Sequence, residues 1–329
     1  MNRPSDVLYP LTFQPIFKER VWGGRNLARL YGKPLPAGKI IGESWEISDR
    51  PRDASVITNG PLAGKDLRWL MENHAAELLG DSQALNGRFP LLIKILDAQE
   101  KLSLQVHPPA EKAAALGGEP KTELWHIADA VPGAELFVGL RRGATRAEFE
   151  RRLKDGTVAQ CFHRLPVKAG DTMFLPSGRV HAIGAGLVIF EIQQNSDTTY
   201  RVFDWNRVGL DGKPRELHVA ESLTSIDFGD FEPALVQSAF AGDAAVRRRW
   251  LVRDKLFNVE ALELATGASV TLETGRLQVV ACLSGELRVQ STGTSVAVPP
   301  GGFCLVPASL DETQLQAATG AKLLLVVAG

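Results

Sequence analysis

Three side chains that could bind a metal or a substrate alternate along residues 101–108. Successive side chains of a β-strand point to opposite faces, so Ser103, Gln105 and His107 share one face and apolar residues share the other. An imidazole and an amide oxygen on one face suit a divalent metal at the floor of a polar pocket. A solvated outer face of an antiparallel sheet is the alternative interpretation, and this stretch alone leaves both open.

Two further segments supply ligand types that this face lacks. Residues 121–127 alternate in the same way and carry Glu123, and His181 follows a turn-rich segment. With Gln105 and His107 they form a set that suits Zn²⁺ and is compatible with other divalent first-row metals. Such a set leaves coordination positions free for water or substrate. A histidine satisfied within the core is the alternative for His181.

The segment before His181 has a turn pattern of its own. Gly170-x5-Pro176-x-Gly178-x2-His181 resembles the second conserved motif of the cupin superfamily, small antiparallel barrels that hold a metal at their mouth. Gly170 permits a tight turn into one strand, Pro176 and Gly178 form the turn out of it, and His181 then points inward. The superfamily motif continues with Asn four residues after the His, where this chain has Ala185.

The elements expected to position these residues are mainly strands. Alternating or apolar runs predict strands within residues 7–22, 41–48, 89–96, 101–108, 121–127, 172–175 and 187–194. An apolar stripe predicts a helix over residues 65–79, and a capping box from Thr145 to Glu148 opens a second helix that runs through Leu153. A short helix is also expected to open at residues 215–218.

The end of the chain differs from the rest. Residues 229–249 are small and polar, which predicts a linker, and the run Arg247-Arg248-Arg249 that ends it is more often a solvated surface than an anion-binding patch. Residues 250–329 contain short β-branched strands, as in a small sandwich or barrel. All six histidines lie at or before His218, so no metal site is expected beyond it.

These patterns predict a mainly β chain. We expect two cupin-type antiparallel barrels or jelly rolls with a few short helices. A catalytic domain would span residues 1–235, and a second barrel without a metal would span residues 236–329, where Gly301-x5-Pro307 looks like a worn copy of the turn pattern.

The composition limits the possible partners. A formal net charge of −1 gives no bulk electrostatic preference for nucleic acid or for an anionic membrane. The three cysteines are widely spaced and form no CxxC pair, which is typical of a reducing compartment. The first residues lack the apolar core of a signal peptide, and the apolar run at residues 323–328 is too short to span a bilayer. We expect a cytoplasmic monomer or weak homodimer that acts on a small molecule.

Several motifs in order extend the resemblance beyond the cupin superfamily. They are Val-Trp-Gly-Gly (21–24), Gly-Glu-Ser-Trp-Glu-Ile-Ser (42–48), Ser-Leu-Gln-Val-His-Pro (103–108), Lys-Thr-Glu (121–123), Pro-Ser-Gly-Arg-Val-His-Ala (176–182) and Glu-Ile-Gln-Gln-Asn-Ser-Asp-Thr-Thr-Tyr-Arg (191–201). Together they resemble type I phosphomannose isomerases in their short bacterial form. The resemblance covers about residues 14–222 and implies an aldose–ketose isomerase that interconverts mannose 6-phosphate and fructose 6-phosphate through a cis-enediol.

The resemblance also implies roles for individual residues. One zinc ion per chain would be held by four ligands, namely Gln105, His107, Glu123 and His181. Arg201 would lie near the reacting carbons, with Glu191 and Asp197 in the same pocket, and Ser103 and Lys121 would contact the sugar phosphate. Arginine loses its proton too reluctantly to act as a base, so Glu191 is the better candidate for proton transfer.

Some features leave alternatives open. Where this chain has Pro-Lys-Thr-Glu at 120–123, some relatives have His-Lys-Pro-Glu, so a ring-opening acid at that His cannot apply here. The phosphate could be held by Lys121 or by Arg141, Arg142 or Arg179. A cupin isomerase for another aldose, a non-catalytic sugar-binding cupin and an iron dioxygenase remain alternative functions.

Overall fold

The chain folds almost entirely into antiparallel sheets. The computed structural model describes residues 8–291 and 293–329. The prediction that the first residues lack the apolar core of a signal peptide therefore concerns residues that lie partly outside the described ranges. The first sheet is six-stranded, in the order β1 (Ile16–Gly24), β2 (Ile41–Ile47), β5 (Leu91–Ala98), β12 (Leu187–Gln194), β7 (Glu123–Ala130) and β10 (Thr172–Leu175). The second is five-stranded, in the order β13 (Tyr200–Phe203), β6 (Leu104–Val106), β11 (His181–Ile183), β8 (Glu135–Leu140) and β9 (Phe162–Pro166).

Two more large sheets follow in the sequence. The third sheet is six-stranded, in the order β14 (Ala241–Gly242), β15 (Val246–Arg253), β16 (Phe257–Leu264), β23 (Ala321–Ala328), β18 (Gln278–Ser284) and β21 (Phe303–Val306). The fourth is four-stranded, in the order β17 (Ser269–Thr271), β22 (Gln314–Ala317), β19 (Leu287–Ser291) and β20 (Thr294–Val298). A small two-stranded sheet pairs β3 (Asp49–Arg50) with β4 (Asp53–Ala54).

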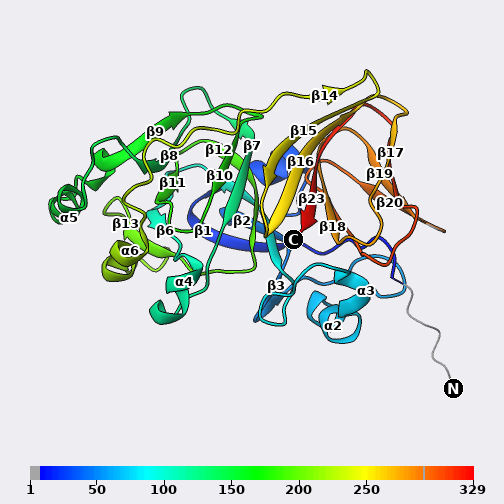
Figure 1. Cartoon of the computed structure of the whole chain (residues 1–329), viewed down its shortest axis with the longest axis horizontal. Coiled ribbons are helices and arrows are strands. Elements are labelled where there is room, and N and C mark those ends of the chain that lie inside the picture. The colour runs from blue at the N-terminus through cyan, green and yellow to red at the C-terminus, as the bar shows by residue number, and fades with distance from the viewer. Residues whose placement is uncertain (1–7, 292) are drawn as a thin grey trace.

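Short helices lie at the periphery of these sheets (Figure 1). They are α1 (Asn26–Tyr31), α2 (Leu67–Asn73), α3 (Ala75–Leu79), α4 (Ala110–Ala113), α5 (Arg146–Lys154) and α6 (Val219–Ser225), with 3₁₀ turns η1 (Ala114–Leu116) and η2 (Val158–Cys161). Within residues 8–291 and 293–329, none of the helices has the length and hydrophobicity that crossing a membrane requires.

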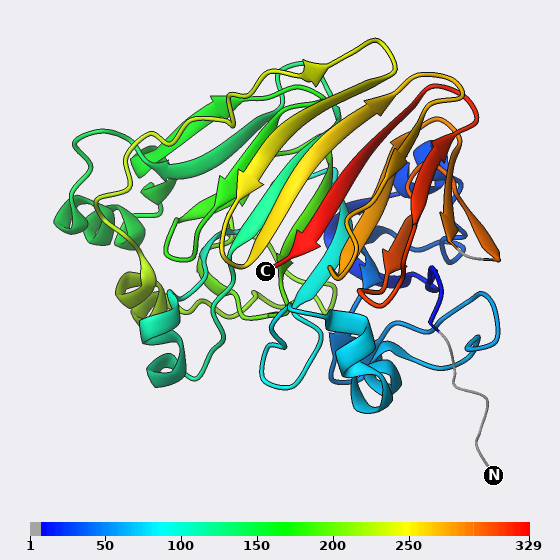
Figure 2. The same cartoon turned by 45° about the vertical axis from the view of Figure 1, so that its right-hand side comes forward.

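The four large sheets stack in the order second, first, third, fourth (Figures 1 and 2). The first sheet is therefore covered on both faces, and every residue of β12 is buried. Val188, Phe190 and Ile192 face the third sheet, whereas Leu187 and Ile189 face the second. This alternation follows from the period of two along a strand.

The third sheet has the same two-sided burial. On β23, Leu324 packs against the first sheet, whereas Leu323 packs against the fourth. The rings of Phe190 and Phe303 stack across the interface between the first and third sheets, with 5.5 Å between their centroids. Consequently, one hydrophobic core joins both halves of the chain.

The expected mainly β class with a few short helices is confirmed, but the sheets do not close into barrels. Each half is a pair of facing sheets with open edges. Strands of the first pair lie within residues 16–203 and those of the second pair within residues 241–328. We propose two cupin-type units divided near residues 235 and 236. The amino-terminal segment crosses between them, since Leu11 and Leu305 exchange backbone hydrogen bonds of 2.9 and 2.8 Å.

Two helix predictions need correction in detail. The helix expected over residues 65–79 is split into α2 and α3 at His74, whose φ of −139° is not helical. The break lies between the two halves of the apolar stripe, both of which pack into the shared core. The helix expected to open at residues 215–218 begins only at Val219. Only half of the predicted capping box forms: Thr145 Oγ1 accepts a 3.1 Å hydrogen bond from the Glu148 amide at the start of α5, whereas the Glu148 carboxylate pairs with Arg141 and Arg152.

Replacement of Phe190 by alanine should destabilise both halves of the protein together. The side chain is fully buried between the first and third sheets, so the substitution should lower the free energy of unfolding by about 3–5 kcal/mol. Urea denaturation would measure this loss. Val208→Ala, at a half-exposed position, should change the stability by less than about 0.5 kcal/mol. Equal effects of both substitutions would contradict a shared core.

Candidate active site

A pocket of about 550 Å³ opens between the first and second sheets. Six of the predicted site residues line it, namely Ser103, Gln105, Lys121, Glu191, Asp197 and Arg201. The other three, His107, Glu123 and His181, lie directly beyond Lys121 and Gln105. The structure therefore brings together all the predicted residues, although they come from separate segments of the chain.

The innermost group of these residues is a cluster of two imidazoles and a carboxylate. The potential ligand atoms of His107, Glu123 and His181 all lie within 4.8 Å of one another, and all three residues are buried. The carboxylate lies between the rings, with Glu123 Oε1 3.4 Å from His107 Nε2 and Oε2 3.6 Å from His181 Nε2. Gln105 lies at the edge of the cluster, its amide nitrogen 3.3 Å from His181 Nε2.

Strand pairing and one turn bring these residues together. His181 on β11 lies opposite Gln105 on β6, and Glu123 at the start of β7 lies opposite Leu175 on β10. Gly178 adopts φ +93°, and its amide donates a 2.8 Å hydrogen bond to the His107 carbonyl. The predicted turn thus holds the segment of His181 against the segment of His107.

Both histidines are held as neutral rings with a free Nε2. His107 Nδ1 donates to the Thr198 carbonyl at 2.8 Å, and His181 Nδ1 donates to the Arg179 carbonyl at 2.9 Å. A carbonyl can only accept, so Nδ1 carries the proton and Nε2 keeps its lone pair. Burial lowers the pKa of His107, and burial together with His107 lowers the pKa of His181 to about 3. This is the form of imidazole that binds metals.

The carboxylate of Glu123 is ionised and lacks ordinary hydrogen bonds. Burial opposes its charge, but Lys121 and then His107 outweigh this effect and hold the pKa of Glu123 well below its usual value. Among the described residues, none gives either oxygen a well-aligned hydrogen bond, although the ammonium of Lys121 contacts Oε1. A buried carboxylate beside two imidazole lone pairs fits a divalent metal.

A second polar group forms one wall of the pocket, and of its members the sequence analysis named only Glu191 as a site residue. In the first sheet, Trp45, Lys94, Glu191 and Trp125 lie side by side on adjacent strands. Glu191 accepts a 3.0 Å hydrogen bond from the Trp125 indole, and its other oxygen lies 3.3 Å from the Lys94 ammonium. Glu43 lies 3.9 Å from the same ammonium.

The charges in this wall compensate one another. Burial would raise the pKa of Glu43, but Lys94 and Arg20 outweigh it and lower the pKa to about 2. Arg20 donates to Glu43 at 2.8 Å, and the Trp45 indole donates to it at 2.6 Å. Burial raises the pKa of Glu191 in spite of Lys94. Glu191 is consequently a stronger base, when ionised, than an exposed glutamate.

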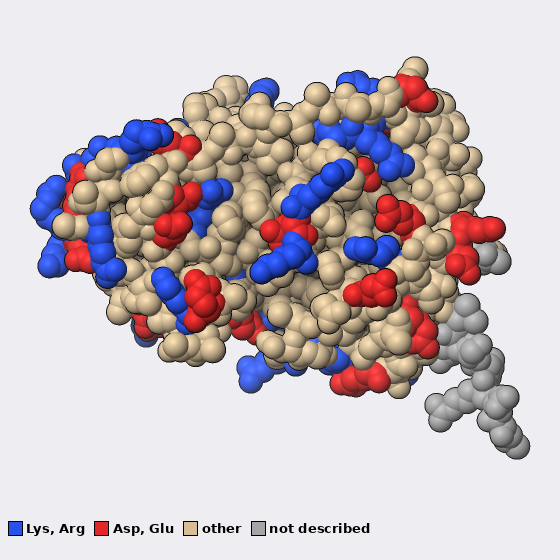
Figure 3. Space-filling view, in the orientation of Figure 1, with Lys and Arg blue, Asp and Glu red and all other residues tan. Residues whose placement is uncertain are grey.

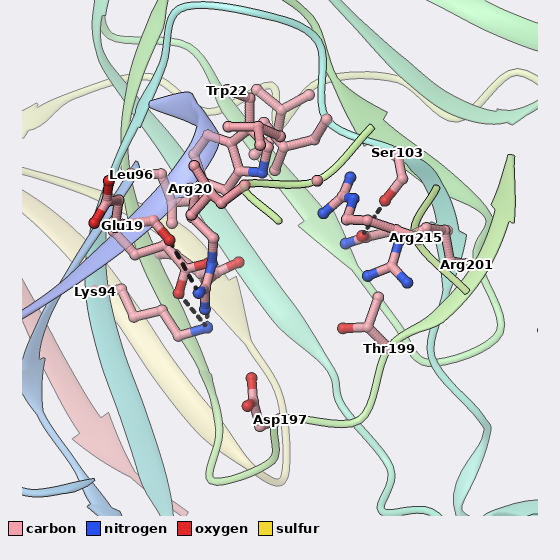
Figure 4. A pocket seen from close by; sticks show the side chains of 18 of the residues that line it. Glu19, Arg20, Trp22, Lys94, Leu96, Ser103, Asp197, Thr199, Arg201 and Arg215 are labelled. Atoms are coloured by element: carbon pink, nitrogen blue, oxygen red, sulfur yellow. Dashed lines mark hydrogen bonds and ion pairs between the residues drawn. The ribbon is translucent and has the colours of Figure 1, made fainter. Parts of the chain in front are cut away.

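Two guanidinium groups form the opposite wall (Figure 4). Arg201 donates to the Glu216 carbonyl at 2.7 Å, and its Nε is buried without a partner among the described residues. Arg215 pairs with Asp204 at 2.6 Å, and Asp204 also holds Arg207 at 2.8 Å. Burial, followed by repulsion from Arg215, lowers the pKa of Arg201. Among the described residues, Arg201 forms no ion pair with a carboxylate, whereas Arg207 and Arg215 share Asp204.

The three arginines weighed above as phosphate ligands lie elsewhere. They occupy ion pairs outside the pocket, Arg141 with Glu148 at 2.7 Å, Arg142 with Glu232 at 3.4 Å and Arg179 with Asp230 at 2.8 Å. Arg215, which the sequence analysis placed in a helix start, faces the pocket instead. No local sequence signal distinguishes Arg215 from other arginines, because the loop that brings it to the pocket is far in sequence from the ligand motifs.

Comparisons with known proteins agree with this architecture. The family model for the catalytic domain of type I phosphomannose isomerase matches residues 11–129. Mannose-6-phosphate isomerase ManA of Bacillus subtilis is 37% identical over 310 residues, which cover 93% of this chain and 96% of the relative. The probable mannose-6-phosphate isomerase GmuF of the same bacterium is 35% identical over 316 residues, which cover 94% and 97%.

A solved structure extends the similarity to three dimensions. The crystal structure of mannose 6-phosphate isomerase from Bacillus subtilis superposes with a TM-score of 0.88 at 29% identity, covering 97% of this chain and 99% of that one. The similarity thus spans both pairs of sheets, including the half that lacks histidine. The chain belongs to the type I phosphomannose isomerase family.

Proposed function

We propose that this protein is a zinc-dependent mannose-6-phosphate isomerase that interconverts mannose 6-phosphate and fructose 6-phosphate through a cis-enediol. The main support is the convergence of His107, Glu123 and His181 next to a pocket that also holds a buried carboxylate and two arginines. The relatives named as mannose-6-phosphate isomerases support the same substrate. The pocket volume of about 550 Å³ lies in the range of small-molecule sites.

The residues of the inner cluster would hold the metal. His107, His181 and Glu123 offer three ligand atoms, and a half-turn of the Gln105 amide would present its oxygen as a fourth. A bound Zn²⁺ would supply a Lewis acid that stabilises negative charge developing on the substrate oxygens. Lys121 is a charged donor in this region, because Glu123 raises its pKa against the effect of burial.

Glu191 is the proposed base for proton transfer between C1 and C2 of the sugar. Its carboxylate lines the pocket, and Trp125 and Lys94 fix its orientation from two sides. Transfer of a proton from one carbon to its neighbour requires a single base that can reach both positions. Its raised pKa brings it closer to neutral pH, where a base is most effective.

Arg201 and Arg215 are the proposed ligands of the phosphate. Planar guanidinium groups bind phosphate through paired charge-assisted hydrogen bonds, and Arg201 forms no ion pair with a carboxylate among the described residues. Arg201 is thus a phosphate ligand in this proposal and not a base. The hydroxyl of Ser103 and the carboxylate of Asp197 also line the pocket, where they could contact sugar hydroxyls.

The surroundings of the cysteines support the expected cytoplasmic location. Cys161, Cys282 and Cys304 are all free and buried. Burial raises the pKa of the Cys282 thiol to about 12, so it stays protonated and unreactive at neutral pH.

Replacement of His181 by alanine should remove both the metal and the activity. The variant loses one of three converging ligands, so zinc content and turnover of mannose 6-phosphate should fall together. A chelator that removes the metal from the unmodified protein should have the same effect. Metal analysis and a coupled assay for fructose 6-phosphate would measure both. His126→Gln, a change to a buried histidine outside this cluster, should retain zinc. No turnover by zinc-loaded unmodified protein would disprove the proposed function.

Substitution of Arg215 by glutamine should weaken substrate binding through the phosphate. A lost charge-assisted contact is worth about 1.5–3 kcal/mol, so KM for mannose 6-phosphate should rise about tenfold or more, with a smaller change in kcat. Steady-state kinetics would show this split. Arg142→Gln removes the same charge from the surface and should leave KM unchanged. An unchanged KM in the Arg215 variant would place the phosphate elsewhere.

Replacement of Lys94 by methionine should shift the pH dependence of the reaction. Lys94 holds the pKa of Glu191 down against burial, so its removal should raise that pKa further. The base must be ionised to accept a proton, and the acid limb of kcat/KM should therefore move to higher pH, with the largest loss of activity at low pH. Lys101→Met, at an exposed position, should leave the profile unchanged. An unmoved acid limb would argue against Glu191 as the base.

A further inference from the structure

A second cavity lies between the first and third sheets, away from the active-site pocket. Its volume is about 320 Å³, and we call it the seam cavity because both halves of the chain line it. The first half contributes His126 of β7 and residues 168–171, the turn before β10. The second half contributes Arg249 of β15, Glu263 of β16 and Lys322 of β23. The proposed isomerase chemistry uses none of these residues.

A buried histidine forms one side of the seam cavity. Along β7, Glu123 and Trp125 face the active-site side of the first sheet, so His126 faces the third sheet. His126 is only 5% exposed, and its Nδ1 lies 3.0 Å from Thr172 Oγ1. This contact leaves Nε2 as the ring nitrogen available to the cavity.

The run of three arginines at the start of β15 divides into paired and unpaired members. Arg247 pairs with Glu263 at 3.1 Å, and Arg248, on the opposite face of the strand, pairs with Glu260 at 3.3 Å. Arg249 pairs with no carboxylate among the residues that the structure describes. Basic side chains gather beside β15 on the face drawn in Figure 3.

The guanidinium of Arg249 is held in place but keeps an unused donor. One nitrogen donates to the Gly170 carbonyl at 2.7 Å, and the group lies 5.0 Å from the centre of the Phe240 ring. Its Nε is buried and has no hydrogen-bond partner in the described part of the chain. The cavity is therefore lined by a fixed guanidinium whose charge has no carboxylate partner among the described residues.

The remaining charges around the seam cavity do not neutralise Arg249. Lys168 pairs with Asp171 at 2.8 Å, whereas Lys322 shares Glu263 with Arg247, each at 3.1 Å. Among these residues, the positively charged side chains outnumber the carboxylates. A small anion in the cavity would therefore meet a field of favourable sign.

We propose that the seam cavity is a binding site for a small oxyanion of the phosphate type, either free or as the phosphoryl group of a small metabolite. Arg249 supplies a guanidinium without a carboxylate partner among the described residues, His126 a ring nitrogen and Lys168 an ammonium at the rim. Guanidinium donors match the geometry of phosphate oxygens. Such an anion would join β7 of the first half to β15 of the second. This site is independent of the proposed isomerase activity.

Phosphate titration of the zinc-loaded protein tests the proposal. All titrations use the Arg215→Gln variant, because this substitution weakens phosphate binding in the active-site pocket. Calorimetry should still detect binding of inorganic phosphate, at the seam cavity. Adding Arg249→Gln should weaken this binding at least about tenfold, the loss expected for one charge-assisted contact. Adding Arg248→Gln instead removes a paired arginine from the other face of β15 and should leave the affinity unchanged.

A second variant covers the case in which Arg249→Gln fails to fold. Lys168 is 83% exposed, so Lys168→Glu should fold normally while its new negative charge weakens phosphate binding. Unchanged affinity in both variants, or equal losses in the Arg248 and Arg249 variants, would overturn the proposal. Titration with glycerol 3-phosphate distinguishes free phosphate from a phosphorylated metabolite as the natural ligand. If glycerol 3-phosphate binds more tightly than phosphate and this binding depends on Arg249, the ligand is a metabolite. If it binds equally or more weakly, the ligand is the free anion.

Discussion

The first sheet has no solvent-facing side, and this constraint governs the rest of the structure. A strand buried on both faces must alternate between two different interiors. On β12, one set of side chains packs in the core shared with the third sheet, while Glu191 on the other face reaches the pocket. On β7, Glu123 reaches the inner cluster and His126 the seam cavity. One strand can therefore contribute to both sides of the sheet, as Phe190 and Glu191 do at adjacent positions of β12.

Burial of the charges in the Glu191 wall is tolerated because each has a partner of opposite sign. Isolated ionised groups in such an environment would be strongly unfavourable, and loss of one member of a buried pair typically costs about 3–5 kcal/mol. Lys94 contacts two carboxylates, and Glu43 contacts two cations. The charged groups of this wall are thus coupled, and the ionisation of Glu191 depends on charges that other strands carry. Arg201 differs from these groups, because it forms no ion pair with a carboxylate among the described residues and so can bind an anion.

The sequence identified the residues of the inner cluster, but of the wall it identified only Glu191 as a site residue. Alternation along residues 101–108 and the turn before His181 are features of single segments, so they can be read without knowing how strands pair. Lys94 is a lone charge in an apolar run, and its meaning depends on the register that places it beside Glu191. Because β2 carries acidic residues on both faces, alternation could not show that Glu43, and not Glu46, faces the pocket. Pairing between distant strands also decides that the sheets stay open, which no local signal reports.

The core shared by the two halves has a consequence for how this chain can be cut or evolved. If the carboxy-terminal half were removed, the face of the first sheet that carries Val188, Phe190 and Ile192 would be open to water. A broad, apolar β surface of this kind promotes aggregation. The half without histidines therefore serves as a permanent cover that keeps the ligand-bearing sheet soluble. The apolar face of this half is therefore reason enough for selection to retain it.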